Sequence, residues 1–201
     1  MFISFEGTEG VGKSTLIRGV ATELKSKGID FIVTREPGGT PLAEQIRGLL
    51  LTPDGEQIAP ACELLLLFAA RAQHLSQVIE PALARGQWVL CDRFIDASFA
   101  YQCGGRHLPM QQVQALVEQF VSVLPTKTFW LDAPVEVGMA RAGKRGALDR
   151  FEQERHEFFE RVRAVYAERA AAEPERIVKL DATLAAWKVL KAAVAELSVQ
   201  G

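Results

Sequence analysis

The stretch Gly7-Thr8-Glu9-Gly10-Val11-Gly12-Lys13-Ser14 decides the fold. It matches the pattern of glycine, four residues, glycine, lysine, and serine or threonine, and it lies between the apolar run Phe2-Ile3-Ser4-Phe5 and a helix-like stretch starting at Ser14-Thr15. Backbone N–H groups of such a loop and the following helix N-terminus point at phosphate oxygens, while the lysine reaches the β- and γ-phosphates and the serine holds Mg²⁺. We therefore expect a nucleoside triphosphate to bind at Gly7 to Thr15.

Other nucleotide-binding patterns fit less well. In a dinucleotide fingerprint read from Gly10-x-Gly12, Thr15 stands where the third glycine belongs. The chain has no Asn-Lys-x-Asp run, which GTPases use to recognise guanine, so a signalling switch is disfavoured. The phosphate loop alone does not distinguish a kinase from an ATPase.

Length and composition indicate a single domain over residues 1–201. A net charge of −2 does not indicate the basic surface that nucleic-acid binding needs, so we expect no nucleic acid as a partner. No apolar run approaches the roughly 20 residues that cross a membrane, and the N-terminus resembles no leader, so we expect a cytoplasmic protein with no membrane partner. Three widely spaced cysteines, Cys62, Cys91 and Cys103, are expected to be reduced thiols.

Short apolar runs alternate with amphipathic stretches along the whole chain. The expected strands are Phe2–Phe5, Phe31–Thr34, Trp88–Cys91, Thr128–Leu131 and Ile177–Leu180. The expected helices are Ser14–Lys27, Pro41–Leu50, Cys62–Ala84, Pro109–Val123, Asp149–Ala172 and Leu184–Leu197. This alternation predicts an α/β fold, a doubly wound parallel sheet of about five strands with helices on both faces. Ligands of such sheets bind at the carboxyl ends of the strands.

The run Leu64-Leu65-Leu66-Leu67-Phe68 is apolar around the whole helix, unlike a half-exposed helix. It predicts either a central helix or packing against a second subunit, and we favour the second.

Charged residues follow the second expected strand in Arg35-Glu36-Pro37-Gly38-Gly39-Thr40. Proline and two glycines fix a tight loop there, and Arg47 on the next helix could face the same pocket. Mononucleotide kinases keep the acceptor phosphate at this position, although a surface turn with solvated charges is the alternative.

Two carboxylates compete for the Mg²⁺-supporting role at a strand end. Asp92 follows a buried strand and precedes Arg93, which could clamp a phosphate. Asp132 runs into Ala133-Pro134, where a carboxylate often caps a helix, so we rank Asp92 first. Metal ligation is thus expected at Ser14 and Asp92, directly or through water.

Further polar side chains share helical faces. Ser98, Tyr101 and Gln102 fall at i, i+3 and i+4 after Arg93 and could present hydroxyls and an amide to a nucleoside. Phe68 and Arg71 lie three apart and would suit a pyrimidine, but from spacing alone a core phenylalanine beside a solvent-reaching arginine is favoured.

Four motifs together carry a family resemblance: Phe5-Glu6-Gly7, Arg35-Glu36-Pro37-Gly38-Gly39-Thr40, Asp92-Arg93-Phe94 and Ser98-Phe99-Ala100-Tyr101-Gln102. In this order and spacing they resemble bacterial thymidylate kinases over nearly the whole chain. The resemblance implies a homodimeric P-loop nucleoside monophosphate kinase that transfers the γ-phosphoryl group of ATP to dTMP, giving dTDP and ADP for dTTP synthesis, with Mg²⁺.

The resemblance also implies roles for individual residues. Phe68 would stack on thymine, Arg71 would read its carbonyl edge, and Gln102 and Ser98 would complete base recognition. Arg93 would hold the dTMP phosphate, and Glu9 would meet the deoxyribose 3′-hydroxyl. The whole expected dTMP site is Glu9, Glu36, Pro37, Arg47, Phe68, Arg71, Arg93, Ser98, Tyr101 and Gln102.

One variant of the family carries an arginine inside the phosphate loop, and this chain does not. The basic cluster Arg141, Lys144, Arg145 and Arg150 resembles the mobile lid of the other variant, at residues 141–152, and its glycines suit a segment that closes. We expect Arg141 to contact ATP, and Lys13, Arg93, Arg145 and Arg150 to be catalytic.

Two rival functions remain at this stage. A deoxynucleoside kinase would need a carboxylate base, for which Glu36 is the candidate, whereas dTMP as acceptor already carries an anionic oxygen. An ATPase module without an acceptor would have no use for the residues between Arg35 and Gln102.

Overall fold

The computed structural model describes residues 1–52, 56–143 and 149–197. Five parallel strands form one sheet in the order β2-β3-β1-β4-β5. The strands are β1 (Phe2–Glu6), β2 (Phe31–Arg35), β3 (Trp88–Asp92), β4 (Lys127–Asp132) and β5 (Ile177–Asp181). The doubly wound α/β fold is thereby confirmed, and each predicted strand ends one residue later than expected.

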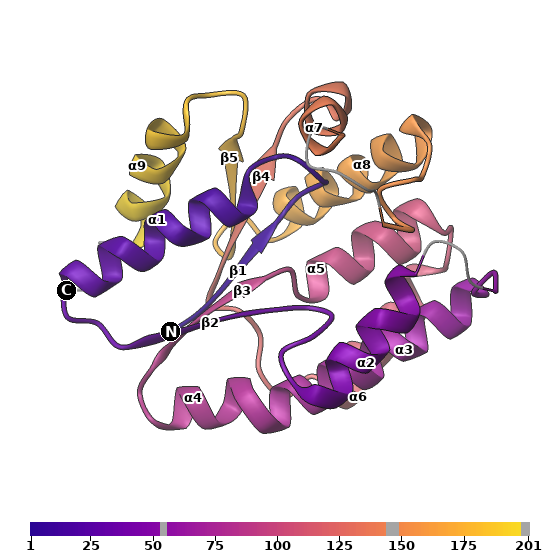
Figure 1. Ribbon diagram of the computed structural model, residues 1–201, viewed down its shortest axis with the longest axis horizontal. Coiled ribbons are helices and arrows are strands. Elements are labelled where there is room, and N and C mark those ends of the chain that lie inside the picture. Colours follow the sequence, from indigo (N-terminus) through magenta and orange to yellow (C-terminus); the bar gives the residue numbers. More distant parts are fainter. Residues whose placement is uncertain (53–55, 144–148, 198–201) are drawn as a thin grey trace.

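Helices cover both faces of the sheet (Figure 1). On one face lie α1 (Lys13–Ser26) and α9 (Ala186–Leu197). The other helices are α2 (Pro41–Leu51), α3 (Pro60–His74), π-helix η1 (Leu75–Ile79), α4 (Glu80–Ala84), α5 (Ile95–Ser98), π-helix η2 (Phe99–Gly105), α6 (Met110–Phe120), α7 (Val135–Ala142) and α8 (His156–Ala172).

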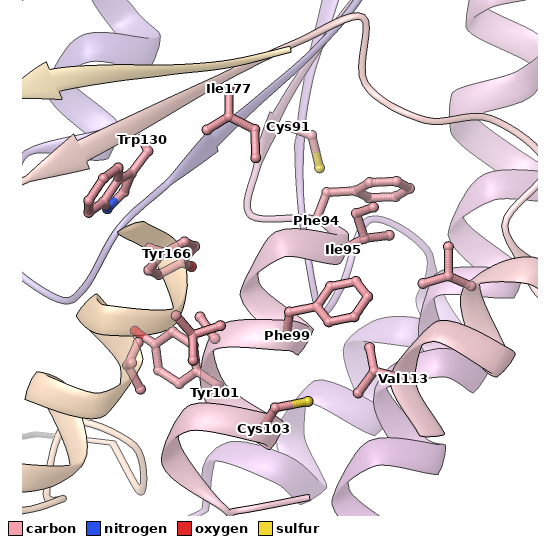
Figure 2. Close-up of a cluster of buried hydrophobic side chains, with 14 of the residues drawn as sticks. Cys91, Phe94, Ile95, Phe99, Tyr101, Cys103, Val113, Trp130, Tyr166 and Ile177 are labelled. Atoms are coloured by element: carbon pink, nitrogen blue, oxygen red, sulfur yellow. The ribbon is translucent and has the colours of Figure 1, made fainter. Parts of the chain in front are cut away.

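The central strands β1, β3 and β4 are buried on both faces, because alternate side chains enter two separate cores. Ile3 and Phe5 of β1 pack with α1 and α9. Phe2 belongs to the opposite core, which β3 and β4 share with α3, η2 and α8. Figure 2 shows part of that core, where Trp130 of β4 lies beside Tyr166 of α8, Phe94 lies just before α5 and Phe99 begins η2.

Strand register brings the site together. β1 lies between β3 and β4, with Phe5 opposite Asp92 and Glu6 opposite Trp130. The loop after β1 therefore begins beside the residues that follow β3, at the carboxyl edge where ligands of such sheets bind.

Several helix predictions were wrong in their bounds. The helix expected from Asp149 begins only at His156, because the Asp149 carboxylate accepts the N–H groups of Phe151 and Glu152, both at 2.9 Å, and closes a turn instead. The helix expected at Cys62–Ala84 is continuous but contains the π-helical turn η1. Helices α5 and α7 were expected only as a helical face after Arg93 and a helix start at Ala133-Pro134, without bounds.

The apolar run in α3 divides between core and surface. Leu64 is buried, Leu66 and Leu67 pack against a small core formed with α2, and Leu65 is 59% exposed. Most of the run is therefore explained within one chain, and Leu65 remains available for a contact with a second molecule.

Candidate functional site

The phosphate loop curls between β1 and α1, and close packing explains two of its glycines. A Cβ at Gly7 would lie 2.5 Å from the carbonyl oxygen of Leu131, and one at Gly10 would lie 2.0 Å from that of Gly138. Both glycines also have positive φ angles, +132° and +72°. The neighbouring strand β4 and helix α7 thus press on the loop and hold its shape.

The Lys13 ammonium lies within the curl of the loop. Its Nζ donates to the carbonyl oxygens of Gly7 at 3.2 Å and Thr8 at 2.9 Å. Burial, followed by repulsion from Arg93, lowers the pKa of Lys13 to about 8. A phosphate that binds here would offset both effects and keep the lysine charged.

A cavity of about 910 Å³ opens in front of this loop. Its walls include Glu9 to Thr15 of the predicted ATP site, Asp92, Arg93 and Arg141. Residues 182–186 after β5 close the far side, where Arg141 donates to the Ala182 carbonyl at 3.1 Å. The volume is large enough for a nucleoside triphosphate.

The two competing carboxylates differ sharply in their surroundings. Asp132 is bound by Arg163 at 2.6 Å and Lys179 at 2.9 Å. Asp92 lines the large cavity, and its buried Oδ1 has no hydrogen-bond partner among the described residues. A buried unpaired carboxylate oxygen beside Lys13 and Ser14 has the donor chemistry that Mg²⁺ prefers, directly or through water.

A second, smaller cavity of about 100 Å³ adjoins the first. Most of the predicted dTMP-binding residues line it, namely Glu9, Glu36, Pro37, Arg47, Arg71, Arg93, Ser98, Tyr101 and Gln102. Glu9, Glu36, Arg47 and Arg93 line both cavities and form the wall that the two share. The apolar part of the wall comes from Leu51, Leu67, Phe94, Ala97 and Phe151.

Arg93 lies at the junction of the cavities. Its guanidinium donates to the Gly7 carbonyl at 2.8 Å and to Glu9 at 2.6 Å, and it packs over the Tyr101 ring. Burial opposes its charge, but Tyr101 and Glu9 raise the pKa of Arg93 well above its ordinary value. Its backbone has a positive φ of 67°, which is unusual for a residue other than glycine. The site therefore holds a permanent cation at the junction of the two cavities.

A buried ionic network forms part of the wall of the smaller cavity. Arg71 donates to Glu36 at 2.7 Å, to Ser98 at 3.0 Å and to the Phe94 carbonyl at 3.1 Å. His74, which sequence reasoning left without a role, faces the other oxygen of Glu36 at 3.1 Å. Both oxygens of Glu36 are therefore engaged inside the protein.

Phe68 does not line the smaller cavity in this structure. It is buried in the core, and the Arg71 guanidinium lies 4.7 Å from its ring centre. Arg71 is itself 3% exposed. The alternative interpretation of this pair, a core phenylalanine beside an arginine that reaches solvent, is therefore wrong for Arg71.

The polar face after Arg93 is assembled partly by a π-helix. Tyr101 and Gln102 lie in η2, whereas Ser98 ends α5, and all three line the cavity. The Tyr101 hydroxyl donates to Glu9 at 2.7 Å, and Gln102 donates to Glu63 at 3.0 Å. π-Helical turns often occur at functional sites.

This geometry agrees with the comparisons with known proteins. The family model described as "Thymidylate kinase" matches residues 5–193. The chain belongs to the thymidylate kinase family.

Relatives named thymidylate kinase match nearly end to end. The chain is 57% identical over 199 residues to that of Acinetobacter baumannii (strain AYE), covering 98% of this chain and 100% of the relative. It is 60% identical over 186 residues to that of Acinetobacter baylyi, covering 92% of each. The crystal structure of thymidylate kinase from Ehrlichia chaffeensis superposes with a TM-score of 0.81 at 30% identity, covering 98% of both chains.

The expected lid is only partly described. Lys144 and Arg145 lie outside the described residues. Arg150 lines neither cavity, because it binds Glu63 at 2.5 Å and the Leu50 carbonyl at 2.7 Å. In this arrangement Arg150 lies away from the phosphate loop, and a catalytic role would require the segment to rearrange.

Sequence reasoning missed residues 182–186, which form one wall of the large cavity. They follow β5, so the rule that ligands bind after strand ends could have found them. It also missed Glu63, an acid in the apolar run of α3 that no motif marks.

Proposed function

We propose that the chain transfers the γ-phosphoryl group of ATP to dTMP, with ATP in the large cavity and dTMP in the smaller one. The observation that carries this assignment is Arg93, which lines both cavities and donates to the phosphate-loop residues Gly7 and Glu9. The activity follows from family membership, and the two cavities supply one site for a donor and one for an acceptor.

On the donor side, backbone N–H groups of Gly10 to Ser14 and the Lys13 ammonium would hold the ATP phosphates. Lys13 would exchange its contacts with the Gly7 and Thr8 carbonyls for phosphate oxygens. Arg141, on the wall beside Ala182, would contact the nucleoside end.

Mg²⁺ fits the residues present. Ser14 and Asp92 both line the donor cavity, and the unpaired Asp92 Oδ1 is the acceptor that a cation or its bound water would satisfy. When bound, the ion would neutralise charge on the phosphates during transfer.

On the acceptor side, Arg93 would hold the dTMP phosphate, and Glu36, Pro37 and Arg47 would shape the rim of its site. Arg47 is fixed by donation to the Pro37 carbonyl at 2.9 Å. Arg71, Ser98 and Gln102 would contact the base, and Glu9 with Tyr101 the sugar. Phe68 would reach thymine only after side chains move, since it does not line the cavity here.

The reaction needs no strong base, because a dTMP phosphate oxygen is already an anion at neutral pH. This chain's residues would align the acceptor oxygen with the γ-phosphorus and neutralise charge. Lys13 and Arg93 would supply the cations, and Arg145 and Arg150 would add further ones on closure of the lid. The competing deoxynucleoside kinase is disfavoured because Glu36, its candidate base, is occupied by Arg71 and His74.

The test is ADP release in a coupled assay with nucleosides and nucleoside monophosphates, including a reaction without acceptor. We expect dTMP to be used well, dUMP less well and purine monophosphates hardly at all. One lost hydrogen bond to a buried group costs about 1–3 kcal/mol, or roughly ten- to hundredfold in kcat/KM. Equal kcat/KM for dGMP and dTMP, faster use of thymidine, or undiminished turnover without acceptor would each contradict the assignment.

The homodimer and the cytoplasmic location are also proposals. Leu42, Leu49 and Leu65 on the adjacent helices α2 and α3 are each about half exposed or more, which suits an apolar contact between two copies. Sedimentation at micromolar concentration would show twice 22.1 kDa for a dimer and 22.1 kDa for a monomer. All three cysteines are free thiols. No helix in the described part of the chain is long and apolar enough to cross a membrane.

A further inference from the structure

Glu63 is a buried acid immediately behind the smaller cavity. It lies in α3, is 0% exposed and does not line either cavity. It accepts hydrogen bonds from Gln102 Nε2 at 3.0 Å, Arg106 Nε at 3.2 Å and Arg150 Nη2 at 2.5 Å. The two guanidinium groups balance its charge, so its place behind Gln102 is electrostatically stable.

Glu63 determines which way the Gln102 amide faces. A carboxylate only accepts hydrogen bonds, so Gln102 must present its NH₂ group to Glu63 and turn Oε1 away. That Oε1 is buried and has no partner among the described residues, and Gln102 lines the smaller cavity. An unpaired buried acceptor in a cavity wall favours a ligand that brings a donor.

We propose that Glu63 is a positioning residue for base choice, which acts by holding Gln102 Oε1 as an acceptor toward the cavity. This proposal rests on the proposed function and deepens it. Arg71, which lines the same cavity as Gln102, offers only donors, so the two suit a base edge with a carbonyl next to a ring N–H. Thymine and uracil have that edge. Cytosine has an amino group and a bare ring nitrogen instead, and its ring nitrogen would face the Gln102 oxygen.

The orientation would be lost without the carboxylate. The two ends of a carboxamide have nearly the same shape, so the amide of Gln102 could rotate at little steric cost if its partner both donated and accepted. Glu63→Gln provides such a partner while keeping the size of the side chain.

The test is kcat/KM for dTMP, dUMP and dCMP in the unsubstituted enzyme and in Glu63→Gln. We expect the dTMP/dCMP ratio to fall about tenfold, the value of one mismatched hydrogen bond, and the dTMP/dUMP ratio to change less than about twofold. A ratio of two kcat/KM values measured on the same variant cancels any effect that is common to all acceptors. One such effect is a change in the lid when Arg150 loses its ion pair with Glu63. A purely structural role for Glu63 would lower all three values together.

Two further variants sharpen the test. Glu154→Gln is the matched control, because Glu154 also pairs with Arg106 but has no contact with Gln102, and its dTMP/dCMP ratio should match the unsubstituted enzyme. In a Gln102→Ala background, adding Glu63→Gln should leave the dTMP/dCMP ratio unchanged. An unchanged ratio in the single variant, or an equal fall in Glu154→Gln, would overturn the proposal.

A measurement on the unsubstituted protein covers the case in which Glu63→Gln does not fold. The Gln102 side-chain amide protons should exchange with water at least about tenfold more slowly than those of exposed glutamines. Equally fast exchange would overturn the role of Glu63. Failure of the unsubstituted chain to phosphorylate dTMP would instead remove the proposed function, and with it this proposal.

Discussion

The two cavities are built in different ways. Donor-side residues Gly7 to Thr15 are contiguous in the chain, and backbone groups and glycines fix their geometry. The acceptor side is assembled from side chains on α2, α3, α5 and η2, joined by the buried contacts of Arg71 with Glu36 and of Gln102 with Glu63. Lys13 of the loop should thus serve ligand binding alone, whereas a charged residue in the acceptor network should serve folding as well.

The largest expected effect is that of Lys13→Ala on the loop side. We expect turnover at saturating ATP to fall by at least about a thousandfold, because the variant loses the charge that faces the phosphates. The melting temperature should stay within a few degrees, since among the described residues the Lys13 ammonium donates hydrogen bonds only to loop carbonyls. Lys25→Ala, on the same helix, is the control. Near-normal turnover of folded Lys13→Ala would contradict the loop assignment.

Substitution of the lid arginines tests whether the phosphate loop supplies all the positive charge that phosphoryl transfer needs. Because the phosphate loop has no arginine, Arg145→Ala and Arg150→Ala should each lower kcat far more than the affinity for dTMP. Catalytic arginines in related transfers are worth roughly 10³–10⁵ in kcat. Single-turnover rates and dTMP titrations measure the two quantities. A raised KM for dTMP with unchanged kcat in Arg150→Ala would assign Arg150 to its Glu63 contact alone.

Arg71→Met tests the acceptor side for a double role. It leaves Glu36 buried with only His74 beside it, and breaking a buried pair typically costs about 3–5 kcal/mol. In a chain of this size we expect a fall in melting temperature of roughly 10 °C, together with weaker dTMP binding. The double variant Arg71→Met, Glu36→Gln should recover part of the stability but none of the dTMP affinity. Unchanged stability of Arg71→Met would remove the contrast between the two sides.

The same contrast explains how far the sequence could predict the site. The loop and the residues after strands β1 to β3 were predicted because their positions depend on local pattern and on the parallel sheet. The Glu63–Gln102 contact, 39 positions apart in the chain, and the His74 contact with Glu36 depend on how α3 packs against its neighbours. Spacing alone could not decide whether Arg71 reached solvent or a buried partner, nor that Asp149 would close a turn instead of starting a helix.

The smallest expected effect is a pH dependence confined to the loop. With a pKa of about 8 in the ligand-free enzyme, Lys13 is charged below that pH and neutral above it. Bound phosphates raise that pKa, so ATP affinity should be flat below about pH 7.5 and weaken up to tenfold per pH unit above 8. The sign for stability is opposite. Unfolded lysine has a pKa near 10.4, so the unfolded state binds more protons between pH 8 and 10.4, and the ligand-free enzyme should gain stability from Lys13 there.

Calorimetric titration of ATP and urea denaturation, each from pH 7 to 9.5, measure the two trends. Lys13→Met should abolish both. Glu6, whose pKa burial and Asp96 raise to about 7, titrates across the lower end of this range and remains in the variant, so the Lys13 trends are read above pH 8. Affinity for dTMP, measured without ATP, should not follow the Lys13 titration, because Lys13 lines only the donor cavity. The contrary result would be a fall in dTMP affinity in parallel with ATP affinity above pH 8 that disappears in Lys13→Met. Both cavities would then depend on the Lys13 charge, and the contrast between them would not hold.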